Sequence, residues 1–223
     1  MRLDPRFTTR AFWIGHDLYR PADHPVVATW SEQVVRATLA RTLVPDDAVV
    51  LDVGSGNGAY ALAWSKRRKV VALDYSHRLI AENPMAMRVE GTIFALPFAD
   101  KTFDLVFSGA MLHHVGDVGG ALRELRRVSR GTVVALEPNR NNPAMAAFGV
   151  IVPEERGTLR FSSAWLRRQA STAGLKVRSC TALGWIPPNK IPTWSLPLFR
   201  RLPVCYPLGL HLLLIADREC ASA

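Results

Sequence analysis

Cysteine is scarce in this sequence of 223 residues, which contains only Cys180, Cys205 and Cys220. No two of them have the spacing of a zinc knuckle or of a CxxC redox pair, and three are too few for a disulfide framework. The sequence therefore predicts a protein of a reducing compartment, and we expect no metal site.

Long apolar runs are also lacking. No stretch reaches the roughly 18 apolar residues of a membrane-spanning helix. The first residues, MRLDPRFTTRAFW, contain no apolar core of the length found in signal peptides. We therefore expect a cytoplasmic protein. Hydrophobic residues still make up 48% of the chain, which is enough for one α/β domain with a substantial core.

Acidic residues are outnumbered, because 28 Lys and Arg against 19 Asp and Glu give a net charge of +9. Such an excess can indicate nucleic acid or an anionic membrane as a partner. Here the basic residues form small, separate clusters, each on what reads as the polar face or the end of a helix. This spread favours an ordinary solvated surface and argues against nucleic acid as the partner. The clusters lie at 66–69, 123–130, 167–168 and 200–201.

Apolar runs of strand length alternate with stretches of helical periodicity along the chain. This alternation indicates an α/β fold, with a doubly wound and mostly parallel sheet that is covered on both faces. In such sheets ligands bind at the carboxyl ends of the strands, where Asp52, Asp74 and Ser108 stand. Strands are expected at 49–53, 70–73, 88–92, 103–108, 131–136, 175–185 and 210–216, and the main helices at 26–43, 57–66, 117–128 and 163–173.

The stretch LDVGSGNG, residues 51–58, places three glycines at alternate positions after the first strand. Glycines let the backbone approach a ligand, and the helix that follows offers free N–H groups. Two ligands fit: the pyrophosphate of a dinucleotide, since Gly54, Gly56 and Ala59 match G-x-G-x-x-G/A, or a nucleoside joined to an amino acid. Asp52 favours the second ligand, because a carboxylate repels a pyrophosphate and attracts an ammonium group.

The block EGTIFALPFADKTFDLVFSGAMLHHV, residues 90–115, decides between these ligands. With LDVGSGNG, VVALDYS (70–76), ALRELRRV (121–128) and VVALEPN (133–139), it resembles the class I S-adenosylmethionine-dependent methyltransferases. The order and spacing are those of the methyltransferase type 11 group, which includes ubiquinone- and menaquinone-biosynthesis enzymes. The resemblance implies a Rossmann-like sheet of seven strands with the last strand antiparallel. It also implies S-adenosyl-L-methionine as the cofactor, in-line methyl transfer, and S-adenosyl-L-homocysteine as the product.

The resemblance also assigns cofactor-binding roles. Asp52 matches the acid that interacts with the methionine end of the cofactor. Asp74 matches the acid that accepts both ribose hydroxyls, since a carboxylate can accept two hydrogen bonds, and Tyr75 stands where the family often stacks a side chain on adenine. Ser108 ends the fourth strand, whose backbone carbonyl commonly receives the methionine ammonium. The loop residues that would lie under the methionine end are Gly54, Ser55, Gly56, Asn57 and Gly58.

One position departs from the family pattern. The family often has an acid in G-D-A-x-x-L-P-F that receives the adenine amino group, whereas this sequence reads GTIFALPF, with Thr92 in place of the acid. The Thr92 hydroxyl can accept a hydrogen bond without carrying charge. We therefore expect adenine to be held more by the Ile93 backbone and by packing, and the cofactor affinity to be weaker than typical.

Methyl transfer depends mainly on alignment of the reacting groups, and a general base helps when the acceptor is a hydroxyl. His113 follows the fourth strand at the mouth of the site and titrates near neutral pH, which makes it a candidate base. A structural role for this histidine is the alternative. Glu137 ends the fifth strand and could orient or deprotonate the acceptor, although capping of the following segment, together with Asn139, also accounts for it.

The whole chain is expected to form one methyltransferase domain. It would comprise an N-terminal lid at 1–25, in which Tyr19 contacts cofactor or acceptor, a cofactor-binding half at 26–139 and an acceptor-side half at 140–223. Residues 185–208, WIPPNKIPTWSLPLFRRLPVCYPL, suit a wall over an apolar pocket or peripheral contact with a membrane, and also ordinary core packing.

A small acceptor that is hydrophobic, or linked to a lipid or glycan, is the favoured substrate, in a biosynthetic reaction. Three alternatives remain at this point: an RNA methyltransferase, an NAD(P)-dependent oxidoreductase, and a scaffold protein without turnover. The acceptor atom and the oligomeric state have no signal in the sequence.

Overall fold

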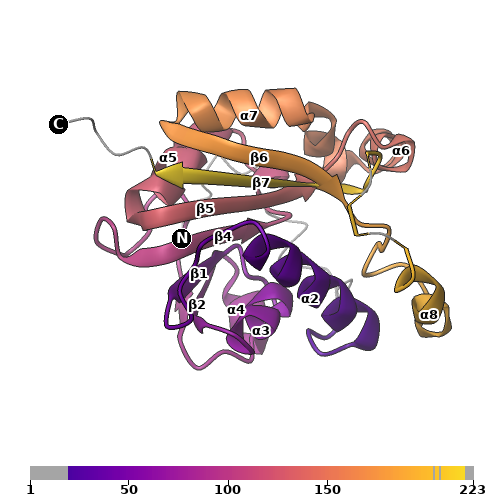
Figure 1. The fold of residues 1–223 in the computed structure, drawn as a ribbon, viewed down its shortest axis with the longest axis horizontal. Coiled ribbons are helices and arrows are strands. Elements are labelled where there is room, and N and C mark those ends of the chain that lie inside the picture. The colour runs from indigo at the N-terminus through magenta and orange to yellow at the C-terminus, as the bar shows by residue number, and fades with distance from the viewer. Residues whose placement is uncertain (1–19, 203, 206, 219–223) are drawn as a thin grey trace.

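A sheet of seven strands runs through the part of the chain that the computed structural model describes, residues 20–202, 204–205 and 207–218 (Figure 1). The strand order is β3-β2-β1-β4-β5-β7-β6. Strands β1 to β5 pair in parallel, and β7 runs antiparallel to both of its neighbours. The predicted α/β class and the antiparallel last strand are confirmed. The strands are β1 (Val49–Val53), β2 (Lys69–Asp74), β3 (Arg88–Glu90), β4 (Phe103–Gly109), β5 (Ser129–Pro138), β6 (Leu175–Leu183) and β7 (His211–Arg218).

Helices cover both faces of the sheet, α2 and α3 on one and α5 and α7 on the other (Figure 1). Two long segments at the carboxyl edge also form short helices, which the sequence patterns did not predict individually. The α-helices are α2 (Pro25–Leu39), α3 (Ala59–Ser65), α4 (His77–Glu82), α5 (Val118–Val128), α6 (Pro143–Ile151), α7 (Ser163–Thr172) and α8 (Leu196–Phe199). The 3₁₀ helices are η1 (Leu112–His114), η2 (Pro153–Arg160) and η3 (Thr193–Ser195).

Side chains alternate between the two faces along each strand, which divides the core into two layers. In β1, Leu51 and Val53 pack in the layer under α5 and α7, whereas Val50 packs in the layer under α2 and α3. Trp30 and Trp64 are fully buried in the second layer. Burial on both faces explains why the strands read as continuous apolar runs rather than alternating ones.

Several predicted boundaries differ from the structure by two residues or more, and two of these differences have a local cause. Helix α2 ends at Leu39 and not at residue 43. The hydroxyls of Thr38 and Thr42 donate to the carbonyls four residues earlier, a bond that competes with the regular helix, and Pro45 disfavours helical backbone at the residue before it. Strand β3 ends at Glu90 because Thr92 turns the chain into an isolated bridge with Ala95.

The predicted lid at 1–25 lies mostly outside the described residues, and the Tyr19 assignment lies wholly outside them. The described part of the lid contains a turn and the start of α2, where the His24 ring accepts a hydrogen bond from the Val26 backbone N–H. The division of the chain into lid and halves stays a prediction. None of the helices in the described residues combines the length and the apolar character that a membrane crossing requires.

Candidate active site

The predicted ligand edge of the sheet forms where β2, β1 and β4 lie side by side. Val53 pairs with Leu73 of β2 and with Ser108 of β4, so the three strands end at the same level. The side chains of Asp52 and Asp74 follow Val50 and Ala72 by two residues, and therefore point to the same face, toward α2 and α3. The sequence thus brings two carboxylates together beside the glycine loop.

The glycine loop has the conformation that its composition predicts. Gly54, Gly56 and Gly58 have φ values of +73°, +53° and +93°, which residues other than glycine rarely adopt. The N–H groups of Gly54 and Ser55 both donate to the Leu73 carbonyl, at 2.8 and 3.0 Å. A Cβ atom on Gly54 would lie 2.5 Å from Cγ of Met111, so this position also needs glycine for lack of space.

Two asparagines hold the loop in place. The buried Asn83 side chain, after the end of α4, donates to the Ser55 hydroxyl at 3.1 Å and to the Gly56 carbonyl at 3.2 Å. Asn57 donates to the Arg20 carbonyl at 2.9 Å, which joins the loop to the start of the described chain. Sequence analysis missed Asn83, whose only local signal is its position before Pro84 at the end of a short helix.

Asp52 carries a fully buried carboxylate, and neither of its oxygens has a partner of hydrogen-bond geometry within the described residues. Burial, and next the nearby Asp74 carboxylate, raise the pKa of Asp52 to about 8, against a smaller lowering by the Ala61 backbone N–H. A buried carboxylate without a partner is costly. The position therefore fits a ligand that brings a positive charge or hydrogen-bond donors, such as the ammonium group of a methionine.

Asp74 is bound to the backbone around it. Its Oδ2 accepts from the Gly56 N–H at 2.7 Å, and its Oδ1 accepts from the Ser76 N–H at 2.8 Å. Burial raises the pKa of Asp74, and these hydrogen bonds oppose the rise. Each carboxylate oxygen can accept a second hydrogen bond, so the side chain keeps the acceptor capacity that a ribose diol requires.

The remaining predicted cofactor residues lie around this carboxylate pair. Tyr75 is half-buried directly after Asp74, and Ile93 is buried. The Thr92 hydroxyl accepts from the Phe94 N–H at 3.3 Å, so it stabilises its own turn. Ser108 is fully buried, and its hydroxyl has no partner in the part of the chain that the structure describes.

A cleft of about 500 Å³ lies beside the glycine loop. Of the predicted cofactor residues only Asn57 lines it, so this cleft does not coincide with the predicted cofactor position. It is lined by Pro21, Ala22, Asp23, Asn57, Leu62, Glu82 and Pro84.

Glu137 caps the 3₁₀ helix η1 from the end of β5. Its Oε1 accepts from the N–H groups of Met111 and Leu112 at 3.1 and 2.8 Å, and its Oε2 accepts from the His113 N–H at 3.2 Å. Ala110 turns the chain from β4 into η1 with a φ of +54°, a conformation that costs a residue with a Cβ about 1–2 kcal/mol. Capping of η1 therefore uses much of the hydrogen-bond acceptor capacity of the Glu137 carboxylate.

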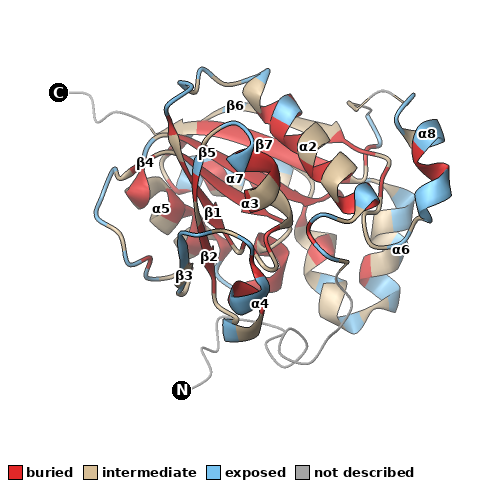
Figure 2. Cartoon of the chain, turned by 90° about the horizontal axis from the view of Figure 1, so that it is seen from below, coloured by how far each residue is buried: buried red, intermediate tan, exposed pale blue. Residues whose placement is uncertain are grey.

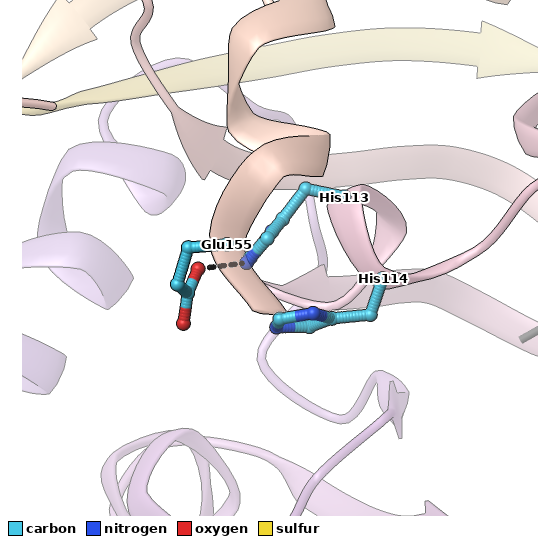
Figure 3. A group of neighbouring side chains, drawn as sticks. All are labelled: His113, His114 and Glu155. Atoms are coloured by element: carbon cyan, nitrogen blue, oxygen red, sulfur yellow. Dashed lines mark hydrogen bonds and ion pairs between the residues drawn. The ribbon is translucent and has the colours of Figure 1, made fainter. Parts of the chain in front are cut away.

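The His113 ring lies between two carboxylates. Its Nδ1 is 2.7 Å from Glu137 Oε2. Its Nε2 is 3.2 Å from Glu155 Oε2, as Figure 3 shows by the dashed line. Burial disfavours the charged ring, but the hydrogen bonds to Glu137 and Glu155 outweigh this and raise the pKa of His113 to about 9. At neutral pH His113 is therefore an imidazolium, which would have to lose its proton before acting as a base. The base assignment stays a prediction.

Two further histidines lie near His113, and the pKa of each is lowered, so their rings are neutral at neutral pH. Burial, and next the His113 charge, lower the pKa of His114 well below its usual range. The His114 ring centroid lies 3.8 Å from that of His113. At the start of β7, His211 is buried against Trp30, and burial lowers its pKa to about 4. Sequence analysis missed Glu155 and His211, which carry no local motif.

Comparison with known proteins agrees with this geometry. Residues 51–135 match the family described as "Methyltransferase domain". A demethylmenaquinone methyltransferase of Roseiflexus castenholzii is 32% identical over 124 residues, covering 51% of this chain and 52% of that protein. A malonyl-[acyl-carrier protein] O-methyltransferase of Erwinia pyrifoliae is 40% identical over 86 residues, covering 36% and 33%. The match thus spans about half the length of the first relative and less of the second.

A solved structure extends the similarity of fold to most of the chain. A SAM-dependent methyltransferase of Thermotoga maritima, described as a possible histamine N-methyltransferase, superposes with a TM-score of 0.68 at 16% identity. The superposition covers 87% of this chain and 91% of that chain. The motif order, the sheet and these matches agree: residues 51–135 are similar to a methyltransferase domain, and the described chain has the fold of the solved Thermotoga maritima SAM-dependent methyltransferase.

Proposed function

We propose that this protein transfers a methyl group from S-adenosylmethionine to a small hydrophobic acceptor. The observation that carries the proposal is the Asp52 carboxylate, which is buried, without a hydrogen-bond partner in the described chain, and adjacent to a loop of three left-handed glycines. Such an acid fits a ligand with an ammonium group and does not fit a pyrophosphate. The oxidoreductase alternative loses support for the same reason.

The residues of the chain bind and align, and the donor, when bound, supplies an electrophilic methyl group on a sulfonium. Asp52 would attract the ammonium, and Asp74 would accept the ribose hydroxyls. The glycine loop would lie against the methionine end, and the Met111 side chain packs against Gly54. Since in-line transfer depends on holding the nucleophile and the methyl in position, fixed geometry is the main contribution of this site.

The surroundings of the carboxyl edge support an apolar acceptor. Helix α6 follows β5 at this edge, and the segment with η3 and α8 follows β6. Both helices carry exposed residues at one end of the molecule (Figure 2). Exposed apolar side chains gathered near one edge indicate a binding surface more often than solitary ones do. The exposed large apolar residues of these segments are Val150, Ile151, Trp194, Leu198 and Leu208.

The same surface supports peripheral contact with a membrane. Trp194 and Leu198 are 82% and 65% exposed, and the exposed Arg200 and Arg201 follow them. Apolar side chains flanked by arginines suit the interface of an anionic bilayer. The names of the relatives, a quinone methyltransferase and a malonyl-[acyl-carrier protein] methyltransferase, are compatible with an acceptor attached to an apolar chain.

His113 enters the mechanism only if the acceptor is a hydroxyl. Its ring would then have to pass one proton to Glu155, the partly exposed carboxylate of the pair, before it could accept the proton of the acceptor. Glu137 would orient the ring through Nδ1 and would keep its own hydrogen bonds to η1.

The test is transfer of a labelled methyl group from S-adenosylmethionine to quinones, to acyl-carrier-protein thioesters and to fractions of a lipid extract. We expect incorporation into one apolar class, and the Asp74→Ala variant should lose it. A variant of an exposed acid, Asp47→Asn, serves as the control because its side chain forms no ion pair within the described residues. Labelling of RNA alone would contradict the proposed acceptor class, and no labelling in any fraction by a protein that binds S-adenosylhomocysteine would support the scaffold alternative.

A further inference from the structure

We propose that His113, His114 and Glu155 form a site for a divalent cation of the zinc type, which the cysteine-poor sequence gave no reason to expect. Each residue offers one ligand atom, and the three atoms lie within 4.8 Å of one another. Figure 3 shows the two imidazoles and the carboxylate converging from η1 and η2. Both histidines are buried and Glu155 is partly buried, so the cluster is enclosed on the protein side and accessible past the glutamate.

One ligand pair already has the separation that an ion requires. His113 Nε2 and Glu155 Oε2 are 3.2 Å apart. Two ligand atoms at 2.0–2.1 Å from a tetrahedral zinc ion lie about 3.3 Å apart. The third ligand atom would have to move inward by up to about 1.5 Å to reach the same geometry, starting from the 4.8 Å limit of the cluster.

A second carboxylate orients the first histidine, as is usual at metal centres. Histidine ligands generally donate their other ring N–H to a carboxylate or a carbonyl, which fixes the tautomer and the ring plane. Glu137 Oε2 accepts from His113 Nδ1 at 2.7 Å and leaves Nε2 directed at Glu155. Glu137 is itself held by the N–H groups of Met111 and Leu112, so the ring has a rigid support.

The close approach of η1 and η2 depends on Gly157. A Cβ atom at this position would lie 1.7 Å from the His113 carbonyl oxygen, so another residue there would push the two helices apart. Arg160 of η2 also donates to the carbonyls of His113 and Val115, at 3.3 and 2.8 Å. These contacts bring Glu155 to two histidines that precede it by about 40 residues in the sequence.

The donor set selects the class of ion. Two imidazoles and one carboxylate suit zinc and neighbouring transition metals, whereas calcium and magnesium prefer oxygen ligands. The nearby Arg160 guanidinium would repel a cation at this site. The negative charges of the Glu137 and Glu155 carboxylates would offset that repulsion. Without an ion, the proton on His113 Nε2 joins it to Glu155, and an ion would replace that proton, which leaves to solvent. With three protein ligands, a fourth coordination position of the ion would stay open for an oxygen atom of a bound molecule.

The experiment is a titration of the chelator-treated full-length protein with Co²⁺, followed by its visible absorption, and with Zn²⁺ in competition with a chromophoric chelator. We expect one equivalent to bind and the Co²⁺ spectrum to show nitrogen and oxygen ligands. The variants Glu155→Gln and His114→Ala should each weaken binding at least 10-fold. The matched control is His77→Ala, which removes an exposed histidine 2.8 Å from Glu90 and should leave the affinity unchanged.

Two results would overturn the proposal: the absence of saturable binding at one equivalent, or wild-type affinity in both Glu155→Gln and His114→Ala. Either result would mean that the charged His113 and its two carboxylates form a metal-free ion cluster. Thermal unfolding and S-adenosylhomocysteine binding of each variant exclude misfolding as the cause of a loss. Because the titration needs neither methyl donor nor acceptor, its outcome is independent of the proposed transferase activity.

Discussion

Replacing Asp52 with asparagine is expected to stabilise the fold and to weaken the cofactor site. The carboxyl group has a pKa of about 8 in the folded protein, against 3.8 for an ordinary aspartate, because it is buried and lies near Asp74. The folded state therefore holds a proton that the unfolded chain has released. The free energy of unfolding consequently falls as the pH rises from about 4 to about 8.

The magnitude follows from the two pKa values. One pKa unit corresponds to about 1.4 kcal/mol, and integration between about pH 5.5 and pH 7.5 gives a loss of about 2–3 kcal/mol from this single group. Asparagine has nearly the same shape and does not titrate, so the variant lacks this loss. Groups that do not interact with Asp52, including His113, titrate alike in both proteins and cancel in the comparison.

The assay is urea unfolding followed by circular dichroism, for wild type and Asp52→Asn at the two pH values. The gap in the free energy of unfolding between variant and wild type should widen by about 2–3 kcal/mol at the higher pH. Asp47→Asn, whose exposed side chain forms no ion pair in the described part of the chain, is the matched control and should not widen this gap. Equal pH dependence in wild type and Asp52→Asn would show that Asp52 is not protonated in the folded protein, and tighter cofactor binding by the variant would remove Asp52 from the cofactor site.

Three further predictions concern the same edge of the sheet. Asp74→Ala should weaken S-adenosylhomocysteine binding at least 10-fold with an unchanged circular dichroism spectrum, and retained affinity would remove Asp74 from the ribose site. Gly54→Ala should cost more stability in urea than Gly56→Ala, because its Cβ would lie 2.5 Å from a neighbouring side chain, whereas nothing lies within 4 Å at Gly56, and equal losses would be evidence against this packing. His113→Ala should lose about 3–5 kcal/mol of stability, because it leaves two carboxylates without their shared cation. Since the pKa of His113 is about 9 in the folded protein against an ordinary 6.5, this stabilisation should be complete below about pH 6.5 and disappear as the pH rises through about 9. A loss of stability that does not depend on pH would contradict this prediction.

The positions of the strands and of the glycine loop could be predicted from the sequence, because each buried parallel strand appears as a local run of apolar residues. Asp52, Asp74 and Ser108 each end such a run, and parallel topology then brings the strand ends to one edge. The left-handed conformations of Gly54 and Gly58 are likewise local properties of a glycine-rich turn.

The partners of the catalytic candidates could not be predicted, because they depend on contacts between distant segments. Glu137 ends a strand in the sequence, but its four hydrogen-bonded groups come from residues 111–113. Glu155 reaches His113 only because Gly157 lets η2 approach η1. Asn83 supports the loop from the residue after the end of α4. No periodicity or motif within one segment carries these relations.

Calorimetric titration of the protein with S-adenosylhomocysteine and, separately, with NADH distinguishes the proposed methyl-donor site from a dinucleotide site. We expect one site of roughly micromolar affinity for S-adenosylhomocysteine and none for NADH. It also predicts release of close to one proton near pH 7, because the bound ammonium would ionise Asp52, whose pKa is about 8. Binding of NADH in place of S-adenosylhomocysteine, or no binding of the latter, would contradict the account.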